Sequence, residues 1–386
     1  MLNKVVKITA FTGTRADYPR IKSLLLKLDK DKKYDLKIVV TGSHLLKSSG
    51  YTIKDIIDDG FKVDKKVKMF LEPLDDSLAG NAQSFARCAL GITKIIKSLK
   101  PNIALVTVDR VETLAIASVC ALMNVPIIHV QGGEISGTID ESIRHAVTKL
   151  SHFHFVATKL SKKRVIQMGE NPKNVFHTGC PYTDILMEEK KKNKTIKIKN
   201  LDIKQRFCIF TMHSVTTNLN EAKILFKDVC EAIKFISKEF LIYAFLPNTD
   251  PGCNFILKNL KGLKNIFLIK NLKSSEFIYL MKKAEFMIGN SSSGIREAAT
   301  FKLPVINIGS RQNGREKSTN VVDCGFSKTE ILKKVNLVTQ NKKFKNKLKY
   351  CRNIYGDGKV AQRCLKIIDN LDLKNVIEKK FFNFQR

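Results

Sequence analysis

One stretch of the sequence, HVQGGEISGTIDESIRH from His129 to His145, concentrates chemically active side chains. It places three carboxylates, two imidazoles and one arginine within seventeen residues. Carboxylates and imidazoles are the groups that proteins use as general acids and bases. The stretch is therefore a candidate part of an acid–base site, with Glu134 and Asp140 as candidate catalytic residues. An alternative for Asp140 is a helix start, where the helix dipole favours negative charge.

A second segment suits the binding of an anion. The loop GNSSSGIRE, residues 289–297, offers backbone N–H groups and serine hydroxyls at the start of a predicted helix. Such a combination binds phosphate, although a serine there can also simply cap the helix. Glu297, about one turn in, is a candidate hydrogen-bond acceptor for a ribose. Arg15, Arg110 and Arg311 follow other predicted strands and favour phosphate binding.

Several common sites are absent from the sequence. No GxxxxGK[ST] loop is present, no GxGxxG follows the first predicted strand, and no HExxH metal-binding spacing occurs. We therefore expect neither an ATPase nor a dinucleotide-binding protein, and we expect no metal and no cofactor. Asp109 and His213, each directly after a predicted strand, complete the set of candidate acids and bases.

Short β-branched runs alternate with helical patterns along the chain and predict the scaffold. Asp17 is expected to cap the helix after the first strand, and a long helix is expected from about Ser77 to Lys100. The predicted strands of the first half are Val5 to Phe11, Leu36 to Val40, Ile103 to Val108, Pro126 to Val130 and His154 to Ala157. Those of the second half are Phe207 to Met212, Leu241 to Leu246, Ile266 to Ile269, Phe286 to Gly289 and Pro304 to Gly309.

This alternation predicts an α/β protein with parallel sheets covered by helices on both faces. Two blocks of it predict two Rossmann-like domains facing a cleft. The expected boundaries are 1–189 for the first domain, 190–205 for a basic linker and 206–365 for a nucleotide-binding domain. Residues 366–386 form a tail expected to pack back on the first domain. Ligands of such sheets bind beyond the carboxyl ends of the strands, where the candidate residues fall.

Composition narrows the function classes. The net charge of +32 raises the hypothesis of nucleic-acid binding, but the excess is mostly lysine spread along the chain, and no recognition motif accompanies it. No apolar run reaches the length of a membrane span, and the N-terminus resembles a strand more than a signal peptide, so we expect a cytoplasmic protein. None of the nine cysteines forms a CxxC pair, which predicts free thiols.

Seven segments together resemble the hydrolysing UDP-N-acetylglucosamine 2-epimerases of sialic and legionaminic acid pathways: TGTRADY, DRVE, GGEISGTIDESIRHAVTKLSH, HSVTT, GNSSSGIREA, GSRQNGRE and IYGDG. The resemblance extends to about Ile368. It implies a two-domain fold of the GT-B type, a nucleotide-sugar substrate, no metal or nicotinamide cofactor, and a homo-dimer or homo-tetramer. It also implies conversion of UDP-GlcNAc and water to N-acetylmannosamine and UDP, through loss of UDP to a glycal and its hydration.

The resemblance also implies roles for individual positions. Asp109 and His213 match residues assigned to catalysis, and Gly179 in HTGCPYTD matches a backbone contact. The remaining matches are nucleotide- or phosphate-binding: Arg15, Arg110, Ser291, Ser292, Glu297 for the ribose, and Arg311. In the chemistry, arginines and a protonated imidazole stabilise the departing phosphate, while carboxylates stabilise the cation and take the proton from C2.

Two positions depart from the family pattern. Val108 stands where the family motif has a glycine, and Gln131 stands where it has a catalytic glutamate. A neutral amide cannot act as a base, so Asp109 or Glu134 takes that role, the substrate differs, or activity is weak. Gln131 can instead hydrogen-bond an amide group of the sugar. UDP- or GDP-linked N,N'-diacetylbacillosamine is thus an alternative substrate, with a non-hydrolysing epimerase, a glycosyltransferase and a nucleic-acid-binding protein as further hypotheses.

Overall fold

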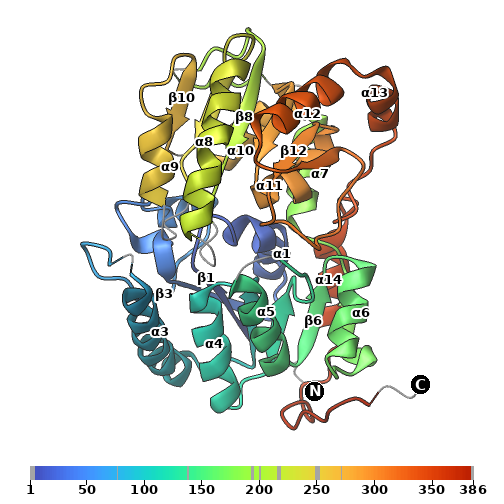
Figure 1. Ribbon diagram of the computed structural model, residues 1–386. Coiled ribbons are helices and arrows are strands. Elements are labelled where there is room, and N and C mark those ends of the chain that lie inside the picture. The colour runs from blue at the N-terminus through green and yellow to red at the C-terminus, as the bar shows by residue number, and fades with distance from the viewer. Residues whose placement is uncertain are drawn as a thin grey trace. The chain divides into compact units, whose positions relative to one another are not determined.

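The computed structural model describes residues 5–75, 77–136, 139–192, 195–199, 201–214, 219–247, 253–270 and 272–383. They form two compact units, and Figure 1 labels many of their helices and strands. Unit 1 takes its described residues from 1–134, 139–185 and 355–386. Unit 2 takes them from 135–138 and 186–354. The last part of the chain thus belongs to the first unit.

Within its described residues, unit 1 forms a parallel seven-stranded sheet in the order β3-β2-β1-β4-β5-β6-β7. The strands are β1 Val6–Thr12, β2 Tyr34–Val40, β3 Lys65–Lys66, β4 Ile103–Thr107, β5 Ile127–Val130, β6 Phe153–Val156 and β7 Val175–His177. The helices are α1 Tyr18–Lys30, α2 Ile53–Asp58, α3 Leu78–Leu99, α4 Val111–Leu122, α5 Ile139–Leu150, α6 Lys159–Gln167 and α14 Val360–Ile368, with short 3₁₀ turns at Gly42–Leu45 and Pro172–Asn174.

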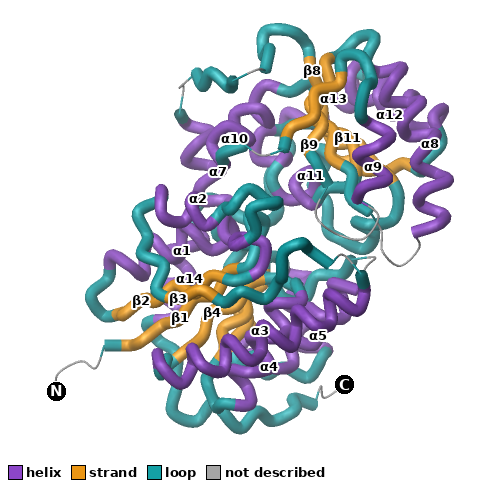
Figure 2. The backbone as a smooth tube through the Cα atoms, turned by 90° about the vertical axis from the view of Figure 1, so that its left-hand side faces the viewer, coloured by secondary structure: helices purple, strands orange, loops and turns teal. Residues whose placement is uncertain are grey.

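Alternation along the strands of unit 1 separates two cores, because successive side chains of a strand point to opposite faces. In β1, Ile8 and Ala10 join the core under α1 and α14, whereas Phe11 joins the core under α3, α4 and α5. Figure 2 shows α1 and α14 on one side of these strands and α3 and α4 on the other. Burial of both faces explains why the strands read as nearly continuous apolar runs.

Unit 2 forms, within its described residues, a parallel six-stranded sheet in the order β10-β9-β8-β11-β12-β13. The strands are β8 Phe207–Thr211, β9 Leu241–Phe245, β10 Ile266–Ile269, β11 Phe286–Gly289, β12 Val305–Ile308 and β13 Val321–Cys324. The helices are α7 Tyr182–Lys191, whose first residues belong to unit 1, α8 Leu219–Ile236, α9 Cys253–Leu260, α10 Ser274–Lys283, α11 Ser292–Arg296, α12 Lys328–Gln340 and α13 Lys342–Lys349, with a 3₁₀ turn at Ala298–Phe301.

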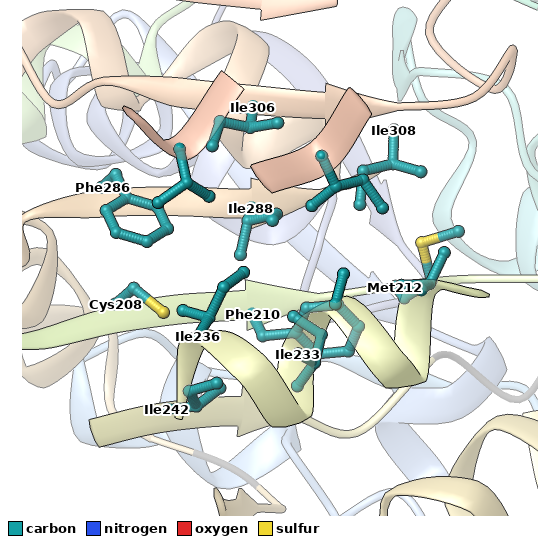
Figure 3. Close-up of a cluster of buried hydrophobic side chains, with 14 of the residues drawn as sticks. Cys208, Phe210, Met212, Ile233, Ile236, Ile242, Phe286, Ile288, Ile306 and Ile308 are labelled. Atoms are coloured by element: carbon teal, nitrogen blue, oxygen red, sulfur yellow. The ribbon is translucent and has the colours of Figure 1, made fainter. Parts of the chain in front are cut away.

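The core on one face of the second sheet is drawn in Figure 3. Cys208, Phe210 and Met212, alternate residues of β8 and its exit, pack there with Ile233 and Ile236 of α8. Burying a large apolar side chain such as Phe210 or Ile233 contributes roughly 1.5–3 kcal/mol to stability.

The predicted fold class of two parallel α/β sheets is confirmed. All ten predicted strands are present with their ends within two residues, while β3, β7 and β13 were not predicted. Ser77, where the long helix was predicted to begin, is the N-cap residue of α3, and its hydroxyl accepts a hydrogen bond from the Gly80 N–H. The capping role predicted for Asp17 is wrong: it occupies the N-cap position of α1 but makes no capping hydrogen bond. No helix among the described residues is long and apolar enough to cross a membrane.

Candidate functional site

The turn after β1 is organised by the buried carboxylate of Asp17. Its oxygens accept hydrogen bonds from the N–H groups of Gly13 at 2.9 Å and Thr14 at 2.8 Å. They also accept one from the Thr12 hydroxyl at 2.9 Å, which is why this side chain does not cap α1. The turn so fixed carries Arg15, whose pKa is lowered by burial and raised in part by Asp55. Arginine nevertheless stays protonated in proteins, so Arg15 is a fixed positive charge at this strand end.

Asp109, two residues after the end of β4, is held by an arginine from α5. Arg144 is almost fully buried, and its Nε donates to Asp109 Oδ2 at 2.9 Å, with a second donation from Nη2 to the same oxygen. Arg144 Nη1 also donates to the backbone carbonyl of Glu134 at 2.5 Å. One guanidinium therefore ties the exits of β4 and β5 together and brings two predicted catalytic residues, Asp109 and Glu134, to one place. Hydrogen bonds from a guanidinium favour the ionised form of a carboxyl group.

Gln131, which follows β5, is fully buried and hydrogen-bonded at both ends of its amide. Its Oε1 accepts from Arg20 at 3.2 Å, and its Nε2 donates to the thiol sulfur of Cys180 at 2.8 Å. Its backbone has φ +70°, a conformation that L side chains rarely adopt. The amide thus links α1, β5 and the segment after β7, which is a structural function that the sequence did not indicate.

Glu112, in the first turn of α4, is a buried carboxyl group that sequence reasoning passed over. It is 3% exposed, and its Oε1 has no hydrogen-bond partner. A Cβ added at Gly13 would lie 2.4 Å from that oxygen, so the β1 turn passes directly over the carboxyl. Burial raises the pKa of Glu112 to about 7, with Asp17 and Asp140 raising it further and Arg110 opposing them. Arg110 and Asp140, both predicted site residues, therefore lie within electrostatic reach of this group.

Both departures from the family motif, Val108 and Gln131, have a positive φ. Val108 replaces a glycine and adopts φ +61°, where a β-branched residue is strained. His129 supports this turn, because its Nε2–H donates to the Val108 carbonyl at 2.9 Å. Burial lowers the pKa of His129 to about 3, so this imidazole is neutral near pH 7 and does not serve as an acid.

Gly179 has φ +93° and lies against the returning C-terminal chain. An added Cβ would be 2.9 Å from Val360 and 3.0 Å from the Tyr355 carbonyl. The next residue, Cys180, donates its N–H to that carbonyl at 2.6 Å. Close packing of two chain segments therefore requires a glycine here, independently of the substrate contact predicted for it.

In unit 2, Asn290 joins the exits of three strands. Its side-chain amide is paired with both backbone groups of His213, and its own carbonyl accepts from Arg311 Nη1 at 3.2 Å and Gln312 Nε2 at 2.8 Å. Two predicted site residues, His213 after β8 and Arg311 after β12, are thereby held around the residue that follows β11. All of these bonds lie at the carboxyl edge of the sheet, as expected for a ligand site.

The serine loop after β11 begins α11 as predicted. Ser291 is the N-cap residue, and its hydroxyl accepts a hydrogen bond from the Ser293 N–H at 3.3 Å, so this side chain caps the helix. Ser292 is the half-buried first residue of α11. Glu297 ends the helix, is 4% exposed, and donates its N–H to the Ser293 carbonyl at 3.0 Å.

The predicted residues thus divide between the units. Unit 1 holds Arg15, Asp109, Arg110, Gln131, Glu134, Asp140 and Gly179, and unit 2 holds His213, Ser291, Ser292, Glu297 and Arg311. The sequence did not indicate the contacts that Asp17, Arg20, Glu112, Arg144 and Asn290 make in the site. A signal existed for the last two, since Arg144 lies in the opening acid–base stretch and Asn290 in the serine loop. Among the described residues, no group of three or more His, Cys, Asp or Glu side chains could hold a metal ion.

Comparison with known proteins shows which family the chain resembles along most of its length. The family model for UDP-N-acetylglucosamine 2-epimerase matches residues 26–369. A UDP-N,N'-diacetylbacillosamine 2-epimerase (hydrolyzing) of Legionella pneumophila is 36% identical over 385 residues, covering 98% of this chain and 99% of that protein. A GDP/UDP-N,N'-diacetylbacillosamine 2-epimerase (hydrolyzing) of Campylobacter jejuni is 34% identical over 388 residues, with the same coverage.

A solved structure agrees on the fold. The UDP-GlcNAc 2-epimerase of Neisseria meningitidis, crystallised with UDP-GlcNAc, matches with a TM-score of 0.82 at 19% identity, over 95% of this chain and 100% of that one. The two parallel sheets and this likeness define an α/β protein of the GT-B type. More specifically, the chain belongs to the UDP-N-acetylglucosamine 2-epimerase family and is an epimerase, which confirms the resemblance seen in the sequence.

Proposed function

We propose that the protein is a hydrolysing nucleotide-sugar 2-epimerase. It converts a UDP-linked 2-acetamido sugar and water into UDP and the free sugar inverted at C2. The observation that carries the proposal is the Asp109–Arg144–Glu134 arrangement, in which one buried guanidinium binds the carboxylate of Asp109 and the backbone carbonyl of Glu134, at the exits of two neighbouring strands. Membership of the epimerase family and two hydrolysing relatives above 30% identity support it.

The order of bond breaking follows from the substrate's chemistry. The proton on C2 is not acidic, because C2 is not adjacent to a carbonyl group. Loss of UDP from C1 must therefore lead and give C1 oxocarbenium character. The Asp109 carboxylate, oriented by its hydrogen bonds from Arg144, is suited to stabilise that positive charge. Removal of the C2 proton then yields a glycal, and water adds to it to give the inverted sugar.

Glu134 and Asp140 are the candidates for the base that takes the C2 proton. We assign no such role to Gln131, because an amide is neutral and this one is hydrogen-bonded to Arg20 and Cys180. The predicted contact between Gln131 and an amide of the sugar stays a prediction, as does the substrate contact of Gly179.

The residues of unit 2 suit the leaving group. His213 as an imidazolium and Arg311 as a guanidinium can stabilise the charge that develops on the diphosphate as it departs. Ser291 and Ser292 can donate hydroxyl hydrogen bonds to the same oxygens, and Glu297 can accept from the ribose. Arg15 and Arg110 of unit 1 are proposed to add positive charge near the phosphates.

The sugar is the open choice within this proposal. The Legionella and Campylobacter relatives, named for N,N'-diacetylbacillosamine, are 36% and 34% identical to the chain, whereas a UDP-N-acetylglucosamine 2-epimerase of Neisseria meningitidis is 29% identical. We therefore put UDP-N,N'-diacetylbacillosamine first and UDP-GlcNAc, the substrate expected from the sequence alone, second. A homo-oligomer and a cytoplasmic location stay predictions.

A product screen tests the proposal. Purified protein is incubated separately with UDP-GlcNAc, UDP-N,N'-diacetylbacillosamine and GDP-N,N'-diacetylbacillosamine, and free nucleotide and free sugar are quantified. We expect equimolar release of UDP and a free 2-epimer, fastest with the UDP-linked diacetylbacillosamine. A 2-epimer that remains attached to UDP would instead identify a non-hydrolysing epimerase, and release of neither product from any substrate would refute the proposal.

A further inference from the structure

The side-chain amide of Asn290 makes the hydrogen bonds that a backbone peptide group would make between two neighbouring strands of unit 2. β8 and β11 run parallel, and the chain leaves them at Thr211 and Gly289. Asn290 Oδ1 accepts the His213 backbone N–H at 2.8 Å, and Nδ2 donates to the His213 backbone carbonyl at 2.9 Å. The Asn290 N–H donates to the Thr211 carbonyl at 3.0 Å. Both backbone polar groups of His213 are thus satisfied by one side chain.

The backbone carbonyl of Asn290 serves a different neighbour. It accepts from Gln312 Nε2 at 2.8 Å and from Arg311 Nη1 at 3.2 Å, both on the segment after β12. The side chain therefore holds the exit of β8, and the main chain holds the exit of β12. A substitution at position 290 changes the first set of bonds and keeps the second.

The residue type at this position is strongly constrained. Asn290 is 1% exposed, so solvent cannot replace a lost bond without cost. An amide supplies one donor and one acceptor in fixed geometry, whereas an ionised carboxylate only accepts. An aspartate here would keep the bond from the His213 N–H and would set a negative oxygen against the His213 carbonyl.

We propose that Asn290 is a positioning residue for the epimerase reaction, which sets the location of His213 through its side chain while its carbonyl separately steadies Arg311. The inference rests on the proposed function, in which His213 stabilises the departing diphosphate. Its distinctive consequence is a separation of effects: loss of the amide harms turnover and leaves nucleotide binding in place.

The test compares Asn290→Asp with Asn320→Asp. Asn320 is also buried in unit 2, and its Nδ2 donates to the Leu303 carbonyl at 2.8 Å, on the segment between Phe301 and β12 and away from the strand exits. The two variants thus make the same chemical change in similar surroundings. We expect Asn290→Asp to lower kcat by about 10²-fold, the size of effect that misplacing a reacting group by about 1 Å produces. UDP affinity, measured by calorimetry without turnover, should stay near that of the unaltered protein in both variants, and kcat should stay near it in Asn320→Asp.

Acidification provides a second readout. A protonated aspartate has both a donor and an acceptor and can restore the pair with His213. The kcat of Asn290→Asp, relative to the unaltered protein, should therefore rise as the pH falls, and that of Asn290→Ala should not. Equal kcat values for Asn290→Asp and Asn320→Asp would overturn the inference, and so would a parallel loss of kcat and UDP affinity in Asn290→Asp.

One measurement separates this inference from the proposed function. The imidazole NMR signals of His213 require no substrate, and we expect them to shift in Asn290→Asp and to stay unchanged in Asn320→Asp. If the unaltered protein turns over no nucleotide sugar, the proposed function fails, and these signals still decide whether Asn290 positions His213. Unchanged signals in Asn290→Asp would contradict the positioning role itself.

Discussion

The strand exits of the two units are stabilised by different chemistry. In unit 1 the turns depend on buried charges, namely Asp17 under the β1 turn and Arg144 between Asp109 and Glu134. In unit 2 the corresponding position is occupied by the neutral amide of Asn290. A buried ion pair is expensive to break, since removing one partner leaves the other unpaired, whereas an amide pair is insensitive to pH. The strand exits of unit 1 should therefore be sensitive to pH, and the amide pair at the β11 exit of unit 2 should not.

The backbone at the strand exits of unit 1 is also more strained than that at the exit of β11 in unit 2. The exit of β4 places Val108 at φ +61°, while the exit of β11 places Gly289 at φ +129°. Glycine adopts such conformations freely, and a β-branched residue does so at a cost of roughly 1–3 kcal/mol. Strain is thus retained beside Asp109 and avoided beside Asn290, as is common where a side chain must be aimed at a reacting group.

The largest effect is expected from neutralising the charge that distinguishes unit 1. Asp109→Asn should lower kcat by about 10²–10⁴-fold, the usual loss when an acid–base group is removed. UDP binding should persist, because the proposed phosphate ligands are untouched. Steady-state kinetics and calorimetry check both statements, with Asp31→Asn at the opposite end of unit 1 as the control. An Asp109→Asn variant with unaltered kcat would remove Asp109 from the mechanism.

Glu112 allows the predicted pH sensitivity of unit 1 to be measured as stability. Its pKa rises from an ordinary 4.5 to about 7 on folding, mainly through burial. Between these values the folded protein binds more protons than the unfolded chain, so this group lowers the free energy of unfolding as the pH rises through the window. The shift corresponds to about 3 kcal/mol.

Glu112→Gln removes that contribution and keeps the shape of the neutral carboxyl group. The stability of the variant relative to the unaltered protein should therefore increase by about 3 kcal/mol between pH 4 and pH 8. Urea denaturation at both pH values gives the two differences, and contributions from all other titrating groups largely cancel. A difference that does not change with pH would show that this carboxyl is not specially disfavoured in its charged form.

A further effect on stability should follow from placing a side chain at the unit 2 exit. A Cβ at Gly289 would lie 2.0 Å from the Thr211 carbonyl oxygen, whereas one at Gly262, with φ +80°, would meet nothing within 4 Å. Both alanine variants carry the strain of a positive φ, on the order of 1–3 kcal/mol, and only Gly289→Ala adds a backbone clash. We expect Gly289→Ala to be the less stable of the two in thermal denaturation. Equal melting temperatures would mean that β8 and β11 can separate at their exits without cost.

Much of the fold was predictable because apolar periodicity is a local signal. Fully buried strands such as Ile103–Thr107 are visible as apolar runs, and Ser77 marks the start of α3. The strands that were not predicted carry little such signal. Lys65–Lys66 is two exposed lysines at a sheet edge, recognisable only through pairing with β2.

The individual residues of the candidate site could be predicted from the sequence. The hydrogen bonds between them could not. Residues after strands were identified because parallel sheets bind ligands at that edge. Contacts such as Arg20 with Gln131 and Asn290 with His213 join residues 111 and 77 positions apart. Sequence spacing carries no information about such pairs, because they are set by strand order and register.

The central claim is that these residues expel UDP and then exchange the hydrogen at C2 of the sugar. It is tested most directly by running the reaction in deuterated water and examining the released sugar by mass spectrometry and proton NMR. We predict a free 2-epimer carrying one solvent deuterium at C2, together with UDP. A released sugar that has kept its original C2 hydrogen and configuration would show simple hydrolysis and would contradict the account.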